Sequence, residues 1–229
     1  MADFLWRVTA KIIQGVLEAK ARCSKPLGTV LMLHSVGAPE PSEFNVSEQA
    51  FERLLKNLSG RRCIRLEEWE SAESGFYALT FDDVPQNFYT VAYPLLRRYG
   101  VPFTIFINRE CMDSEGYLTS GQVKEISRCP LCTIGSHGCS HDFYRRLSHD
   151  GRENDLRQSR DALRSIAGRD VELFAFPYGS VFACGLTDIS LVSSFYRYGF
   201  STLRAHVTRR ADRNFIPRVC VTESHPLCR

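Results

Sequence analysis

The chain has 229 residues, a length that one hydrophobic core can fill, and 44% of them are apolar, as is ordinary for a globular protein. The net charge is only +3 and both signs are spread along the sequence, so the composition excludes the basic tail or stripe that binds nucleic acid. The nine cysteines are an odd number and no secretory signal is visible at the N-terminus, so we expect reduced thiols and a cytoplasmic protein.

The first 25 residues predict an amphipathic helix. Apolar residues recur there at helical spacing: Phe4, Leu5, Val8, Ile12, Val16 and Leu17. Polar and charged residues interrupt them, and the apolar stretch is too short to span a bilayer. The helix either lies on a membrane surface or packs on the outside of the domain, and we favour the second interpretation. We assign residues 1–27 to this N-terminal extension.

Downstream, short apolar runs alternate with longer helical patterns. The predicted strands are 29–34, 77–81, 103–108, 131–135, 171–176, 200–204 and 215–219. The predicted helices are 47–58, 88–99, 120–128, 152–167 and 187–197. Strands separated by helices pair in parallel through right-handed crossovers. We therefore predict an α/β fold, a distorted and incompletely closed (β/α)7-type barrel that forms a single domain over residues 28–229.

Polar or turn residues follow four of the predicted strands. They are His34, Asp82-Asp83, the run from Ser136 to His141, and Pro177-Tyr178-Gly179. Active sites of parallel α/β barrels are built at the carboxyl ends of the strands. These residues should therefore meet at one mouth.

Two of these strand ends have the composition of a metal site. Adjacent carboxylates such as Asp82 and Asp83 are costly unless a cation compensates them, although an Asp-Asp turn alone is common. His137 and His141 are four residues apart, which brings two imidazoles to one side of a helical turn. Two histidines and one carboxylate hold a divalent metal with positions open for water and substrate, which suits metal-assisted hydrolysis.

Three motifs, in this order and spacing, resemble those of the polysaccharide deacetylase family, the NodB-homology domain of carbohydrate esterase family 4. They are Thr80-Phe81-Asp82-Asp83, His137-x-x-x-His141 and Phe176-Pro177-Tyr178-Gly179. The segments 30–36 and 213–219 are similar to the first and last strands of one branch, so the resemblance covers about residues 28–222.

The resemblance implies a metal-dependent hydrolase that removes an acetyl group from a sugar, acting on a C–N bond other than a peptide bond. Asp83, His137 and His141 would bind the metal, usually zinc in this family. Asp82 would act as the base toward water at the metal. The backbone at Pro177 and Tyr178 would contact the substrate and help hold the oxyanion. The implied partner is an acetylated carbohydrate.

The chain departs from the family pattern in two places that concern catalysis. Many members carry an arginine shortly before the Pro-Tyr pair to orient the catalytic aspartate, but here the run is Leu173-Phe-Ala-Phe-Pro-Tyr178. Arg218, in the last predicted strand, is our candidate for that charge. The usual Leu-x-His acid motif is also missing, and His34 occupies the place of the first-strand histidine that serves as the acid in poly-N-acetylglucosamine deacetylases.

Two further functions share the fold and stay open at this stage. One is a catalytically silent carbohydrate-binding member, and the other is an amidase acting on a non-sugar C–N bond. Peripheral membrane contact through residues 1–25 is the less favoured role of the extension.

Overall fold

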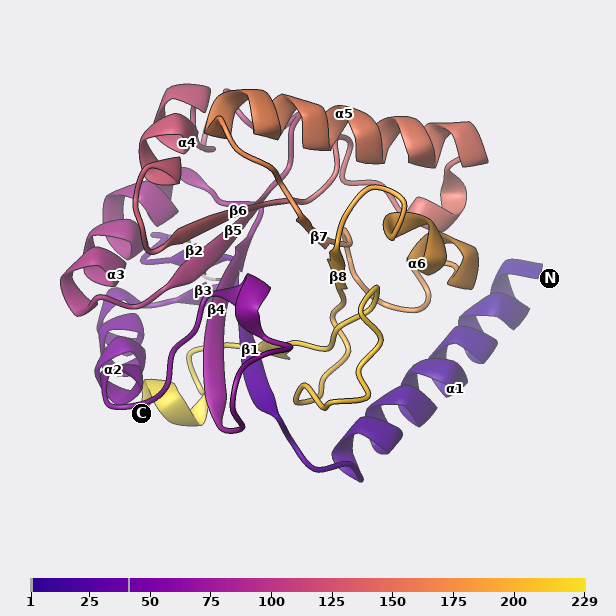
Figure 1. The fold of residues 1–229 in the computed structure, drawn as a ribbon, viewed down its shortest axis with the longest axis horizontal. Helices are drawn as coiled ribbons and strands as arrows, with labels where there is room; N and C mark the ends of the chain where they lie inside the picture. Colours follow the sequence, from indigo (N-terminus) through magenta and orange to yellow (C-terminus); the bar gives the residue numbers. More distant parts are fainter. Residues whose placement is uncertain (1, 41) are drawn as a thin grey trace.

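A curled sheet of seven parallel strands forms the centre of the molecule (Figure 1). The computed structural model describes residues 2–40 and 42–229, and the side chains of residues 2–4 and 186 lie outside that description. In their order across the sheet the strands are β8 (Tyr198–Phe200), β7 (Leu173–Ala175), β6 (Cys132–Ser136), β5 (Phe103–Ile107), β4 (Phe76–Asp82), β1 (Gly28–Leu33) and β9 (Val219–Cys220). A separate two-stranded pair consists of β2 (Ser35–Val36) and β3 (Asn45–Val46).

The sheet curls most of the way to a barrel but does not close as a continuous ladder. The edge strands β8 and β9 are not neighbours in the sheet. Two backbone hydrogen bonds nevertheless join this gap, from Ser201 to the carbonyl of Ile216 and from Ile216 to the carbonyl of Gly199, both 2.8 Å long. The predicted incompletely closed barrel is therefore confirmed.

Helices cover the outside of the sheet, and α1 lies apart from them (Figure 1). Their bounds are α1 (Ala2–Arg22), α2 (Glu48–Ser59), α3 (Tyr93–Tyr99), α4 (Ser120–Ser127), α5 (His149–Ala167) and α6 (Leu186–Val192). Ser47 caps α2 by accepting a hydrogen bond from the Ala50 amide. Gly100 and Gly168 end α3 and α5 in the left-handed conformation that glycine adopts at low cost.

Three predicted elements differ from the structure. The strand predicted at 200–204 lies earlier, as β8, because the Thr202 amide turns away to bond the Gly179 carbonyl at 2.8 Å. The strand predicted at 215–219 lies later, as β9, since Pro217 has no N–H with which to continue a ladder. The helix predicted at 187–197 ends already at Val192, and its predicted last turn is a loop.

Side chains alternate between the inside of the barrel and the helix layer, as the period of two requires. On β1 and β4, Leu31, Leu33, Leu79 and Phe81 belong to the cluster beneath the helices. Val30, Phe76 and Ala78 belong instead to the inner cluster, with Phe106, Phe200 and Ile216. Positions 32, 34, 80 and 82 therefore share the inner face, which brings them to the mouth of the barrel.

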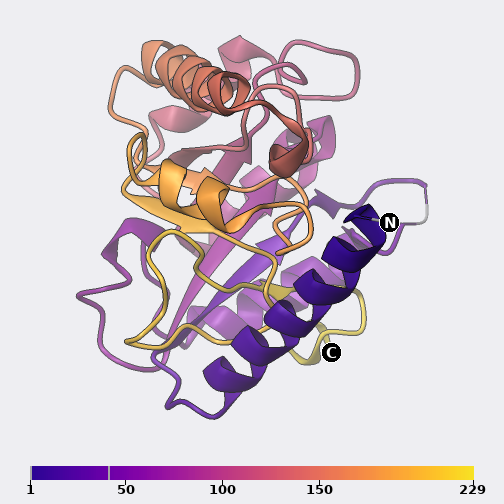
Figure 2. The ribbon, with the colours of Figure 1, turned by 90° about the vertical axis from the view of Figure 1, so that its right-hand side faces the viewer.

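The helix α1 packs along one side of the barrel, beside the C-terminal loops (Figure 2). Ala10 is buried, Trp6, Ile13 and Leu17 are partly buried against the core, and the Trp6 indole donates to the Phe182 carbonyl at 3.3 Å. The helix α1 thus contacts the core from the outside of the barrel, while the division at residue 27 stays a prediction. Within the described chain, no helix has the length and apolar character needed to cross a membrane.

Candidate active site

The carboxyl ends of β1, β4 and β6 bring His34, Asp82 and His137 to the inner mouth of the barrel. Asp82 follows Phe76, Ala78 and Thr80 at intervals of two, so its side chain points inward with theirs. Strand alternation therefore buries a carboxylate, only 2% exposed, in the barrel interior. A carboxylate in such a place requires a partner.

Arg218 is that partner. Its Nη1 and Nη2 donate to the two oxygens of Asp82, each at 2.7 Å, which is the bidentate geometry that a guanidinium forms with a carboxylate. Its remaining donors reach the Ser201 carbonyl at 2.9 Å and the Thr80 hydroxyl at 3.2 Å. The side chain is fully buried above the ring of Phe106. Arg218 thus lies directly against Asp82.

Burial and charge act on the pKa of Asp82 in opposite directions. Burial raises it, but the positive charge of Arg218 and its hydrogen bonds outweigh burial and lower the pKa below its usual value. Asp82 therefore stays ionised and fixed in orientation, as a base requires.

Asp83, His137 and His141 converge beside Asp82. The Asp83 Oδ1 atom lies 3.6 Å from Nε2 of His137 and 3.3 Å from Nε2 of His141. Asp83 and His141 both have positive φ angles, 60° and 54°, which non-glycine residues seldom adopt. The turn at Asp83 swings its carboxylate out of the strand alternation, so the two adjacent aspartates have different surroundings.

The donor set of these three residues fits a divalent metal. The Nδ1 atom of His137 lies 2.8 Å from the Ala175 carbonyl, which can only accept, so Nδ1 carries the proton and Nε2 presents a lone pair toward Asp83. A lone pair that faces a carboxylate is favourable only with a cation or a proton between them. One atom from each of the three residues lies within 4.8 Å of the others. This is the spacing of an open two-histidine, one-carboxylate site.

The pKa shifts follow from the same contacts. Burial lowers the pKa of His137 despite the two nearby carboxylates, so this imidazole stays neutral. For His141 the bond to Asp83 outweighs burial and raises the pKa. The pKa of Asp83 is lowered, because its hydrogen bond and charge interactions with the histidines outweigh burial. The contact between Asp83 and His141 thus lies where a metal would bind.

Asp155 supports the loop that carries His141, and the sequence-based analysis did not identify it. Its Oδ2 accepts hydrogen bonds from the amides of Cys139 at 2.9 Å and Ser140 at 3.2 Å, and its Oδ1 accepts one from the Tyr144 hydroxyl. A Cβ at Gly138 would lie 2.8 Å from this carboxylate, so the glycine leaves room for it. The sequence pattern that could have identified Asp155 is its spacing: it precedes Ser159 and Leu163 at steps of four residues, which places it on the buried face of α5.

The remaining predicted residues lie at different depths. His34 lines the site, and its Nδ1 is buried without a hydrogen-bond partner in the described chain. Tyr178 has a φ of 59°, and its N–H has no acceptor among the described residues. Its ring is half exposed and stacks on Phe143 with centroids 4.3 Å apart. Pro177 is buried outside the cavity lining and has no N–H to donate, so only Tyr178 offers an oxyanion donor.

A cavity of about 370 Å³ opens over this cluster. Its lining comprises Gln14, Met32, His34, Phe44, Asp82, Asp83, His137, His141, Phe176, Tyr178, Thr202, Arg204 and Cys220. Gln14 was not predicted as a site residue, although it lies on the packed side of α1 with Ala10 and Leu17. A polar rim of Gln14, Thr202 and Arg204 around a carboxylate–imidazole floor suits a polar substrate.

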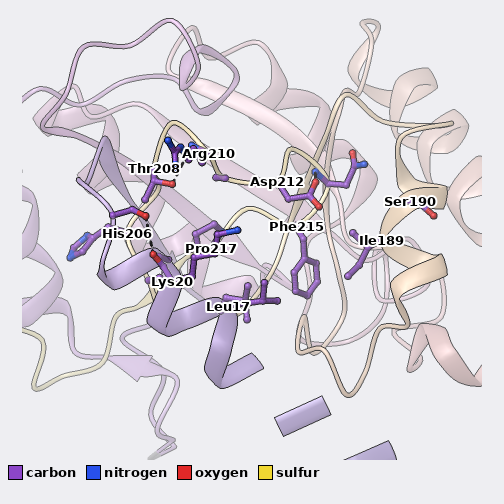
Figure 3. Close-up of a pocket in the computed structure, with 16 residues that line it drawn as sticks. Leu17, Lys20, Ile189, Ser190, His206, Thr208, Arg210, Asp212, Phe215 and Pro217 are labelled. Carbon is purple, nitrogen blue, oxygen red and sulfur yellow. Dashed lines mark hydrogen bonds between the residues drawn. The ribbon is translucent and has the colours of Figure 1, made fainter. Parts of the chain in front are cut away.

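A second cavity, of about 420 Å³, lies between the C-terminal half of α1 and the 203–217 segment (Figure 3). Its walls include Leu17, Ile189 and Phe215, with Lys20 and Arg210 among the polar residues. None of the residues of the carboxylate–imidazole cluster lines it. We therefore assign the chemistry to the first cavity.

Comparison with known proteins agrees with this geometry. The family model for polysaccharide deacetylases matches residues 70–187, just over half of the chain. The chain belongs to the polysaccharide deacetylase family. Asp82, Asp83, His137, His141 and Tyr178 all lie inside the matched residues, whereas His34 and Arg218 lie outside them. The protein is accordingly a carbohydrate deacetylase, a hydrolase.

Relatives and solved structures extend the likeness over most of the chain. The poly-beta-1,6-N-acetyl-D-glucosamine N-deacetylase of Staphylococcus epidermidis is 24% identical, with 89% of this chain and 76% of the relative covered. The deacetylase PplD of Streptococcus pyogenes, in complex with acetate, has a TM-score of 0.80 at 22% identity and covers 87% of this chain and 95% of its own. The IcaB structure from Ammonifex degensii has a TM-score of 0.75 at 24% identity, with 87% and 93% covered. Both solved structures share the fold of this chain.

Proposed function

We propose that this deacetylase hydrolyses the N-acetyl group of a glycan built from N-acetylglucosamine, with a divalent metal, zinc, held by Asp83, His137 and His141. The observation that carries the proposal is the juxtaposition of this ligand set with a buried, Arg218-clamped Asp82 on the floor of one cavity. The substrate class follows the Staphylococcus relatives, which are poly-beta-1,6-N-acetyl-D-glucosamine N-deacetylases.

Each residue has one task in this scheme. Asp82, kept ionised by Arg218, accepts a proton from the attacking water. The free N–H of Tyr178 donates a hydrogen bond to the oxyanion that develops on the acetyl group. His34, which also lines the cavity, donates a proton to the departing sugar amine. When bound, the metal supplies polarisation of the acetyl carbonyl and a lowered pKa for water.

Other side chains of the cavity suit a sugar. The exposed ring of Tyr178, backed by Phe143, offers an apolar face on which a pyranose can stack. Gln14, Thr202 and Arg204 present polar groups around the rim, which suit hydroxyl groups.

The test combines metal analysis with acetate release from N-acetylglucosamine oligomers. We expect wild type to bind about one divalent ion per chain and to release acetate. Asp82→Asn should retain the metal and lose about 10²–10⁴-fold in rate. Asp161→Asn, a surface change on α5, is the matched control and should behave as wild type. Restoring activity to chelated protein with single metals identifies the ion.

Two results would contradict the proposal. If wild type binds no divalent ion at neutral pH, the ligand assignment is wrong. If it binds metal but releases acetate from no N-acetylated sugar, the sugar substrate is wrong and an amidase acting on a non-sugar C–N bond becomes the better hypothesis.

A further inference from the structure

The helix α1 has a second apolar face that nothing in the described chain covers. Leu5, Val8, Ile12 and Val16 follow one another at steps of three and four residues, so they form one stripe along the helix. Their exposed fractions are 60%, 44%, 62% and 61%. The stripe points away from the side that packs on the barrel, where Ala10 is buried.

The stripe is unusual for this protein. Only two other large hydrophobic side chains of the described residues are exposed, Phe44 and Tyr178, and both line the active-site cavity. Single exposed apolar residues need no explanation, but four in register on one helix do. This face of α1 is therefore expected to bind a partner.

The charge of the segment indicates which occupant. Residues 2–25 contain five basic residues, Arg7, Lys11, Lys20, Arg22 and Lys25, against two acidic ones, which gives a net +3. The whole chain also has a net charge of +3, so this segment holds the entire excess and the remainder is neutral. A basic segment with an apolar stripe is complementary to an anionic surface with an apolar interior.

The acidic side chain described on α1 does not oppose this field at the surface. Glu18 is turned toward the protein and is only 15% exposed. It accepts hydrogen bonds from Gln14 at 3.2 Å, from the Arg204 amide at 3.2 Å and from Arg22 at 3.3 Å. All five basic residues of the segment are exposed.

We propose that α1 docks this protein on an anionic lipid bilayer, with Leu5, Val8, Ile12 and Val16 inserted at the headgroup boundary and the flanking basic residues on the lipid phosphates. Amphipathic helices of this composition lie in the plane of the interface. A second copy of the chain suits the face less well, because pairing two α1 stripes would bring two segments of net +3 together.

Docking in this way would hold the active site close to the bilayer. Gln14 lines the catalytic cavity from one side of α1, and the stripe occupies the other side. A helix with its side chains is about 10–12 Å across, so the cavity would begin within about that distance of the lipid. The docking itself does not depend on the proposed substrate.

The test is flotation with vesicles of phosphatidylcholine mixed with phosphatidylglycerol, and with vesicles of phosphatidylcholine alone. Wild type should bind the anionic vesicles more strongly, and rising salt should weaken binding. Ile12→Ser combined with Val16→Ser should lower the partition coefficient at least about tenfold, since each buried methylene is worth about fourfold. Both side chains are exposed, so the fold and acetate release from soluble oligomers should stay unchanged.

A pair of charge variants separates electrostatic attraction from a general loss of charge. Lys11→Gln with Arg22→Gln should weaken binding to the anionic vesicles by about tenfold or more, at about 1 kcal/mol for each basic residue. Lys124→Gln with Arg157→Gln removes the same charge from α4 and α5 and should leave binding unchanged. Failure of wild type to bind the anionic vesicles, or equal binding by the serine variant, overturns the proposal. A wild-type dimer that Ile12→Ser with Val16→Ser converts to a monomer would overturn it in favour of a second copy.

Discussion

Replacing Arg218 with methionine should both destabilise the protein and weaken Asp82 as a base. Methionine has a similar length, but it removes both 2.7 Å bonds to Asp82 and the 2.9 Å bond to the Ser201 carbonyl. Asp82 would then be an unpaired carboxylate, 2% exposed, inside the barrel. The depth of burial makes this ion pair important for stability, since surface ion pairs contribute little.

The expected loss of stability is large. Breaking a buried ion pair by removing one partner costs about 3–5 kcal/mol. The Ser201 carbonyl, left without its donor, adds about 1 kcal/mol. A domain has about 5–15 kcal/mol of stability in all, so Arg218→Met should remove a large share of it.

The assay is a double-mutant cycle measured by urea unfolding with a chelator present, so that metal binding does not contribute. The four proteins are wild type, Arg218→Met, Asp82→Asn and the double variant. Each single change leaves a buried charge unpaired, whereas the double variant removes both charges. The double variant should therefore lose less free energy of unfolding than the two single losses added together, by about 2 kcal/mol or more. Effects that add to within about 0.5 kcal/mol would refute the coupling.

The same variant changes the pH dependence of the reaction. The guanidinium lowers the pKa of Asp82 against the opposing effect of burial, so without it burial prevails and the pKa rises. The acid limb of kcat/KM should therefore move to higher pH. Arg218→Lys keeps the charge without the bidentate geometry, and its acid limb should lie between those of wild type and Arg218→Met.

Three further changes test other parts of the structure. His34→Ala should retain metal and lose about 10²–10⁴-fold in kcat; unchanged turnover would remove this histidine from the mechanism. Asp155→Asn weakens the support of the loop that carries His141, so metal affinity in a competition titration should fall about 10–100-fold, and an unaltered affinity would contradict the support role. Glu223 accepts the amide and hydroxyl of Ser47, and these bonds lower its pKa below 4.5; its stabilisation is therefore present above about pH 4.5 and lost as pH falls through the folded pKa. Glu223→Gln should thus cost up to about 1 kcal/mol at pH 7, because the site is exposed and screened, and progressively less as the pH falls through the folded pKa of Glu223; a loss that does not change with pH would contradict the assignment.

The parts of the fold that the sequence predicted are those where local pattern and tertiary packing agree. Five of the six predicted helices and the first four strands fall close to their observed bounds, since each has a strong apolar period. The last two strands were displaced, because the chain there is shaped by single contacts between segments far apart, such as the Thr202 amide on the Gly179 carbonyl. Such contacts leave no periodic pattern.

The residues of the candidate site also fall into two groups, those that the sequence pattern could place and those that it could not. His34, Asp82 and His137 could be placed because strand ends and a period of two put them on one inner face. Asp155 and Gln14 could not, because their roles depend on which helix face meets the barrel. For α1 this mattered most: the apolar residues noted in the sequence include both the packed Leu17 and the exposed Val16, and only the structure separates the two faces.

The backbone itself explains how two adjacent aspartates take on different roles. Among the described residues, five non-glycine residues have a positive backbone φ angle. Four of the five belong to the candidate site or adjoin it: Asp83, Val84, His141 and Tyr178. Such conformations cost about 1–3 kcal/mol each and persist only where the surroundings impose them. Here the buried Asp82–Arg218 pair fixes the residue before the turn at Asp83, and that turn directs the next carboxylate toward the histidines. The strain is therefore concentrated where one strand must bring two successive carboxylates to the same cavity, which a regular strand cannot do because its successive side chains point to opposite faces.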